Sequence, residues 1–115
     1  KLLLGLQDDA AIERYLEAHR PLQAFTPFTI VDEDALRQEL RGIRERGYAI
    51  GYQEFRLGSC GISAPVYDRH GQVVGGVAIV APPSRFSAAD QERYAAIASE
   101  AGRELSARLG YRPIG

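Results

Sequence analysis

The stretch from Tyr48 to Val80 constrains the fold most, because it is rich in tyrosine, valine and isoleucine and is interrupted by turn residues. Aromatic and β-branched residues favour strands, and turn residues between such runs separate neighbouring strands. We expect three strands, near residues 48–55, 59–67 and 72–81. Asp68–Gly71 predicts a tight connection with positive φ at Gly71, so the last two strands should pair antiparallel. The almost unbroken apolar run of the third strand predicts that both of its faces are covered.

Two helical patterns precede the predicted strands. Asp32 is a suitable amino-terminal cap for a helix that ends near Gly47, a residue suited to left-handed termination. The buried stripe of this helix should consist of Leu36, Leu40 and Ile43. An earlier helix should begin after Asp8 or Asp9 and end before Pro21, where an extended connection to residue 31 begins. Its apolar face should carry Ile12, Tyr15, Leu16 and His19.

A long helix should follow the last strand. Ser87 and Asp90 have the spacing of a capping box, just after the prolines that end the sheet. The predicted apolar stripe of this helix consists of Tyr94, Ile97, Ala98, Ala101, Leu105 and Leu109. Small residues within it permit a close approach to a sheet or to another subunit.

The order of helix, helix, strands and helix predicts an α+β fold, with one antiparallel sheet and covering helices. A chain of 115 residues, of which 45% are hydrophobic and 25% charged, suits one globular domain or most of one. We therefore expect residues 1–115 to form a single domain. Because the chain opens on an apolar stretch at Lys1 and contains no methionine, we expect the domain to be amino-terminally incomplete.

Charge and cysteine content exclude several functional classes. Fourteen basic and 15 acidic side chains give a net charge of −1, which provides no field that would attract DNA. If the protein binds DNA, another segment should make the contact. A single cysteine forms no internal disulfide, and no apolar run approaches the roughly 20 residues of a membrane-spanning helix. We expect a cytoplasmic protein that does not bind membranes.

The residues suited to catalysis or metal binding stand apart from one another. Cys60, in a predicted strand, would need a base within hydrogen-bonding reach to act as a nucleophile. The two histidines, His19 in a helix and His70 in a turn, are not suggestive of such a base. They also lack the spacing of metal ligands. We therefore expect Cys60 to be a small buried residue, and we expect no catalytic residue, metal or cofactor.

Four stretches in order resemble one family, the IclR (isocitrate lyase regulator) family of bacterial transcription factors. They are the aromatic-Thr-x-x-Thr segment Phe25–Asp32, the helix end and strand Arg44–Ala49 followed by Glu54, the strand segment Gly58–Val66, and the Pro-x-Ser-Arg segment Pro82–Ser87. The resemblance implies the carboxy-terminal part of a GAF-like effector-binding domain. It also implies a DNA-binding winged helix-turn-helix outside this chain, a homodimeric or homotetrameric assembly, and no enzymatic activity.

The resemblance places an effector pocket on the strands, at Gly51, Ser59, Gly61, Ala78 and Val80. Family members that hold small carboxylic acids often carry an aspartate near 51, a cysteine near 61 and serines near 78 and 80. Here those positions carry apolar residues or glycine, so side chains that could help a buried carboxylate are absent. We therefore expect a larger or more apolar effector, such as an aromatic acid, with Ser59 and backbone amides as polar contacts.

Two alternatives remain open at this point. The chain could be a constitutive oligomerisation module whose pocket has closed over. It could also be an enzyme of GAF type that uses Cys60, which would require a second thiol or a base beside it. For an effector-binding domain, the last helix and the exposed face near the missing amino-terminal segment are the candidates for the contact between subunits.

Overall fold

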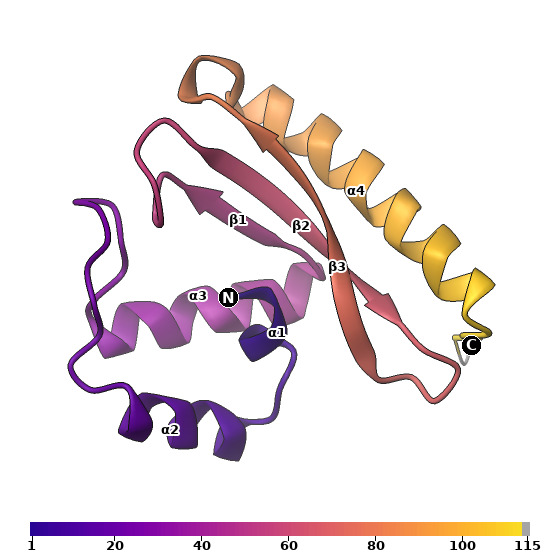
Figure 1. The fold of residues 1–115 in the computed structure, drawn as a ribbon, viewed down its shortest axis with the longest axis horizontal. Helices are drawn as coiled ribbons and strands as arrows, with labels where there is room; N and C mark the ends of the chain where they lie inside the picture. The colour runs from indigo at the N-terminus through magenta and orange to yellow at the C-terminus, as the bar shows by residue number, and fades with distance from the viewer. Residues whose placement is uncertain (114–115) are drawn as a thin grey trace.

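The computed structural model describes residues 1–113, which form one sheet with helices on both sides (Figure 1). The elements along the chain are α1 (Leu2–Gly5), α2 (Asp9–Ala18), α3 (Glu33–Arg46), β1 (Ala49–Tyr52), β2 (Cys60–Tyr67), β3 (Val73–Ala81), η1 (Pro83–Arg85) and α4 (Ala88–Arg108). The strands lie in the order β1, β2, β3, and both neighbouring pairs are antiparallel. The predicted α+β fold is confirmed, whereas the short helix α1 lies in an apolar stretch that was not predicted to be helical.

The predicted helix ends are confirmed by their caps. Asp8 and Asp32 each accept a hydrogen bond from the backbone amide three residues ahead. Gly47 ends α3 in the left-handed region with φ of 85°. Ser87 and Asp90 form both bonds of a capping box. The bonds from these side chains satisfy amide groups that the first turn of a helix leaves unpaired, which explains where the three longer helices begin.

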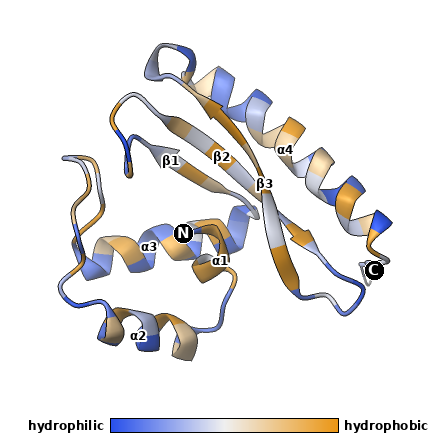
Figure 2. Cartoon of the chain, in the orientation of Figure 1, coloured by the Kyte–Doolittle hydropathy of each residue, from blue (hydrophilic) through white to orange (hydrophobic). Residues whose placement is uncertain are grey.

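Two apolar clusters hold the layers together. The first joins α1, α2 and α3 to the start of β1 and consists of Leu2, Ile12, Leu16, Leu36, Leu40, Ile43 and Ala49. The second lies between the sheet and α4 and consists of Cys60, Ile62, Ala64, Ala81, Phe86, Ala95 and Ala98. Figure 2 shows apolar residues along the strands and α1, while polar and apolar residues alternate along α3 and α4. The sheet is therefore packed on α4 by one face and on α1 by the other.

The prediction that both faces of β3 are covered is wrong. Burial alternates along the strand, and the exposed fractions of Val74 and Val80 reach 58% and 69%. The face that carries the more buried residues packs on α4. On the opposite face, the Leu2 side chain approaches Gly76, but Val80 stays in solvent. An unbroken apolar run cannot distinguish these two arrangements, because valine and alanine occur on both faces of half-buried strands.

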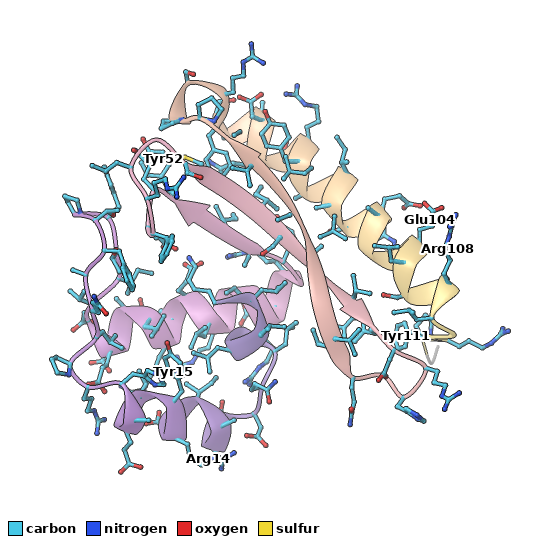
Figure 3. All side chains as sticks on the ribbon, in the orientation of Figure 1. Arg14, Tyr15, Tyr52, Glu104, Arg108 and Tyr111 are labelled. Atoms are coloured by element: carbon cyan, nitrogen blue, oxygen red, sulfur yellow. The ribbon has the colours of Figure 1, made fainter. Side chains whose placement is uncertain are left out.

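The predicted apolar stripe of α4 is also partly wrong. Ile97, Leu105 and Leu109 are about half exposed, with exposed fractions of 53%, 46% and 49%. The buried residues of the helix are Ala95, Ala98, Gly102 and Ser106. Small residues are required there because the helix lies very close to β2: a Cβ atom at Gly102 would stand 2.7 Å from the Pro65 carbonyl oxygen. Figure 3 shows Glu104 and Arg108 on the side of α4 that faces away from the sheet.

Replacing Gly102 by alanine should destabilise the protein. The added methyl group would collide with the Pro65 backbone, which cannot move without disturbing β2. Overpacking of this kind costs about 1–3 kcal/mol, against a gain in helix propensity of up to about 1 kcal/mol. We expect Gly102→Ala to lower the free energy of unfolding by about 1–2 kcal/mol, as measured by urea denaturation.

The matched control is Gly42→Ala in α3. A Cβ atom at Gly42 would stand 2.9 Å from the Arg46 guanidinium, which is the far end of a flexible side chain and can move away. We expect Gly42→Ala to leave stability unchanged or to increase it by up to about 1 kcal/mol. Equal effects of the two substitutions would contradict the close approach of α4 to the sheet.

Candidate functional site

Small residues occupy neighbouring positions on the face of the sheet opposite α4. In the strand register, Ser63 of β2 pairs with Ala49 of β1 and with Ala78 of β3. In the next row on the same face, Gly61 pairs with Gly51 and with Val80. Successive residues of a strand point to opposite faces, so these rows lie side by side. We call the residues Ala49, Gly51, Gly61, Ser63 and Ala78 the floor.

A hollow of about 720 Å³ lies over the floor. Its walls come from segments that are distant in the sequence: Lys1, α2, the connection between α2 and α3, and the loop after β1. The hollow is open because no large side chain rises from the floor. A Cβ atom at Gly51 would make only ordinary contacts, the nearest at 3.6 Å from a Glu54 carboxylate oxygen.

The sequence-predicted site residues do not all lie at this hollow. Gly51, Gly61 and Ala78 are among its lining residues. Val80 is on the same face as Gly61 but is 69% exposed and lies outside the lining. Ser59 also lies outside it, in the turn that closes the loop between β1 and β2, where its amide donates to the Arg56 carbonyl at 3.3 Å.

Ser63 is a lining residue that the sequence analysis missed. It lies two positions after Gly61 in β2, so the period of the strand alone places both residues on one face. The Ser63 hydroxyl forms no hydrogen bond with any of the residues 1–113. It is therefore a polar group of the floor that is available to a ligand.

Two threonine hydroxyls fix the wall above β1. Thr26 donates to the Gln53 carbonyl at 2.6 Å, and Thr29 donates to the Glu54 carbonyl. The Thr29 oxygen also accepts from the backbone amides of Phe25 and Thr26, at 3.1 and 3.0 Å. The connection from Pro21 to residue 31, which was expected to be extended, therefore turns back on itself at Thr29. The threonine bonds join the connection before α3 to the loop after β1. This loop includes residues 53–55, which were predicted to belong to the strand.

The Lys1 side chain contacts β1, the loop after β1 and α3 at the edge of the hollow. Its ammonium group donates to the Ile50 carbonyl at 2.7 Å and to Glu54 Oε1 at 2.9 Å, and it forms an ion pair with Glu54 Oε2 at 2.7 Å. It also lies 3.3 Å from Glu39 of α3. Burial opposes ionisation of Glu39, but the charges of Lys1 and Arg46 outweigh this effect and hold the pKa of Glu39 below its ordinary value.

His19 and Tyr15 form part of the wall contributed by α2 (Figure 3). Their rings stack with centroids 4.0 Å apart, and His19 Nδ1 lies 2.8 Å from the Tyr15 carbonyl oxygen. A carbonyl only accepts hydrogen bonds, so Nδ1 carries the proton and Nε2 remains an acceptor in the neutral ring. The expectation that both residues belong to the buried face of the helix is wrong, because both are exposed.

The Cys60 thiol lies on the other face of β2, away from the hollow. Its exposed fraction is 2%, and it belongs to the apolar cluster between the sheet and α4. The prediction that Cys60 is a small buried residue is confirmed. Neither histidine belongs to this cluster, and Cys60 is the sole cysteine of the chain. The arrangement therefore lacks the base or second thiol that a cysteine nucleophile requires.

The described part of the chain offers neither a metal-binding cluster nor a membrane-spanning helix. Residues 1–113 contain no group of three or more histidine, cysteine, aspartate or glutamate side chains that could hold a metal ion. Among the helices described, none is long and apolar enough to cross a membrane. The hollow over the floor is the candidate functional site.

Comparison with known proteins agrees with the resemblance noted in the sequence. Residues 1–107 match the family model described as bacterial transcriptional regulator IclR C-terminal. The chain is 35% identical over 111 residues to the HTH-type transcriptional regulator KdgR of Escherichia coli, covering 96% of this chain and 42% of KdgR. It therefore spans about two fifths of the length of this relative.

Solved structures of relatives have the same fold. The crystal structure of IclR from Thermotoga maritima superposes with a TM-score of 0.87 at 32% identity, covering 96% of this chain and 44% of that one. The crystal structure of the C-terminal domain of E. coli KdgR gives a TM-score of 0.84 at 33% identity, covering 96% of this chain and 67% of that domain. The relatives are transcriptional regulators and not enzymes, as the sequence predicts. The chain belongs to the IclR family of bacterial transcriptional regulators and corresponds to their C-terminal region.

Proposed function

We propose that the chain is the effector-binding part of an IclR-type regulator and that the effector binds in the hollow over the floor. One observation carries the proposal: Gly51, Gly61 and Ala78 leave open space between the sheet and the α2 side. The volume of about 720 Å³ falls in the range of roughly 300–1,000 Å³ that is typical of small-molecule sites. A constitutive module with a closed pocket would have filled this space, so the hollow argues against that alternative.

The lining favours an effector larger and more apolar than a two- or three-carbon acid, such as an aromatic acid. Such a compound would place its apolar body on the floor, where glycine and alanine allow close approach. Ser63, and not Ser59, supplies the hydroxyl nearest to that body. A short carboxylic acid would leave most of the hollow unfilled and would find few free donors at the floor.

The effector would act by changing the arrangement of subunits, and thereby the DNA binding of a separate helix-turn-helix domain. A ligand shifts an equilibrium only through its different affinities for the states involved. The net charge of −1 supports a role for this chain in sensing and assembly, with DNA contacted elsewhere. We expect a homodimer or homotetramer in the cytoplasm.

The exposed flank of α4 is the candidate for the subunit contact. Ile97, Leu105 and Leu109 each expose about half of their surface, and Ala101 lies between the first two on the same flank. Their spacing places them along one stripe of the helix, next to the face that packs on the sheet. An exposed apolar stripe of this kind is typical of protein interfaces.

Aromatic acids should bind more tightly than short keto acids. We expect saturable binding of benzoate or 4-hydroxybenzoate to the full-length protein in isothermal titration calorimetry, with a negative heat-capacity change from burial of the ring. Pyruvate should bind weakly, because it covers little of the floor. Tight binding of pyruvate alone would contradict the proposed effector class.

Filling the floor should abolish this binding. We expect Ala78→Leu to weaken the binding of 4-hydroxybenzoate roughly tenfold or more, because the new side chain enters the hollow. Val80→Leu is the matched control, two residues along the same face of β3 but outside the lining. It should leave affinity unchanged; an equal loss in both variants would extend the site along β3.

Acidic residues on the exposed flank of α4 should disrupt assembly. We expect the double substitution Ile97→Glu, Leu105→Glu to lower the oligomeric state in sedimentation velocity, because charges would be buried in the contact. Glu100→Lys, on the charged side of the same helix, is the control and should not change it. An unchanged sedimentation coefficient in the double variant would place the contact elsewhere.

A further inference from the structure

We infer that Glu54 selects the effector, favouring a compound that presents a hydroxyl or amine donor to the floor and excluding one that presents a carboxylate there. The inference rests on the proposed function, because it concerns the same hollow. Its basis is the position of the Glu54 carboxylate beside a floor that consists of glycine, alanine and one serine.

The Glu54 carboxylate stands over the glycine row of the floor. It is a lining residue, and one of its oxygens lies 3.6 Å from where a Cβ atom at Gly51 would be. Any side chain at position 51 would therefore lie against this carboxylate. With glycine at positions 51 and 61, a ligand can reach the carboxylate instead.

The Glu54 carboxylate is held in place without being saturated. Lys1 donates to Oε1 and forms an ion pair with Oε2, and Thr29 holds the Glu54 backbone through the carbonyl. An ionised carboxylate has about four acceptor positions, and the hydrogen bond from Lys1 occupies one of them. In the part of the chain that the structure describes, no other side chain or amide donates to it. The remaining positions are available to a ligand in the hollow.

The Lys1 ammonium group itself is not available to an effector carboxylate. Its three donors are directed to Ile50, Glu54 and Glu39, and Arg46 completes the cluster by pairing with Glu39 at 3.1 Å. The floor therefore offers a partly unoccupied carboxylate acceptor, because the nearby cations are already paired with carboxylates. A ligand carboxylate placed there would be repelled, whereas a hydroxyl would donate a charge-assisted hydrogen bond.

The polar groups over the floor thus indicate the orientation of the effector. A donor group would lie at Glu54, and the apolar body would cross the next row of the floor beside Ser63. Residues of one strand face are roughly 7 Å apart, which is about the width of one aromatic ring with its substituent. An acidic group of the same ligand would then point toward the wall that includes His19 and Arg20, whose guanidinium group also pairs with Glu33 at 2.9 Å.

The test compares three benzoates that differ only at position 4: 4-hydroxybenzoate, 4-methoxybenzoate and benzene-1,4-dicarboxylate. The full-length protein should bind the hydroxyl compound roughly tenfold or more tightly than the methoxy compound, because the methoxy group cannot donate to Glu54. The dicarboxylate should bind most weakly. In Glu54→Gln the preference for hydroxyl over methoxy should shrink by roughly tenfold, and binding of the dicarboxylate should improve.

Glu39→Gln provides the matched control. Glu39 contacts the same Lys1 ammonium group at 3.3 Å but is not a lining residue, so this variant perturbs the ion cluster without changing the floor. It should retain the ligand preference of the original protein. Thermal melting of both variants without ligand would report any loss of stability separately from the ratio of affinities.

The outcomes separate the two proposals. An unchanged preference in Glu54→Gln, with binding still abolished by Ala78→Leu, would overturn the role of Glu54 and keep the hollow as the site. A preference lost equally in Glu39→Gln would also overturn it, because the effect would then come from the ion cluster. Absence of saturable binding of all three benzoates would overturn both the effector class and the selection by Glu54.

Discussion

The register of the three strands is the constraint on which the site depends. It aligns Gly51 with Gly61, and Ser63 with Ala49 and Ala78, so that residues with little or no side chain meet across neighbouring strands. A shift by one residue would turn the isoleucine at 62 toward the hollow and the glycines toward α4. The same alternation supplies Cys60, Ile62 and Ala64 to the cluster beneath α4. One pattern thus builds a packed face and an open face on a single strand.

The walls of the hollow depend on polar bonds between segments far apart in the sequence. Thr26 and Thr29 capture carbonyl groups of the loop after β1, and Lys1 bridges that loop to the end of β1 and to α3. Carbonyl groups in a loop have no partner strand, and buried ones are costly unless a donor reaches them. The threonines of the aromatic-Thr-x-x-Thr segment supply such donors. This gives a physical reason for a motif that, in the sequence alone, is only a family resemblance.

Local patterns predicted much of the fold, because caps and turns are encoded within a few residues. Asp8, Asp32 and the pair Ser87 and Asp90 act where their spacing indicates. The faces of β3 and α4 were less predictable, since exposure there depends on which elements lie nearby and how closely. Strand positions alone bring Gly51, Gly61 and Ala78 to the lining of the hollow. Ser59 lies in a turn and not in the strand, and the contact between Lys1 and Glu54 joins residues 53 positions apart in the sequence. The alternation of strand residues indicates neither of these.

A ligand over the floor would touch elements that otherwise meet through few contacts. The floor belongs to the sheet, whereas Tyr15 and His19 belong to α2, which packs on α1 and α3 in a separate apolar cluster. A compound that contacts both the floor and α2 binds best at one distance between them. Its binding therefore favours the arrangement of sheet and α2 that has this distance. The strand that carries Gly61 and Ser63 also carries the residues beneath α4. Binding in the hollow would thus act on the distance between the cluster around α1, α2 and α3 and the cluster beneath α4. A change in this distance is the route by which a ligand could affect the exposed flank of α4.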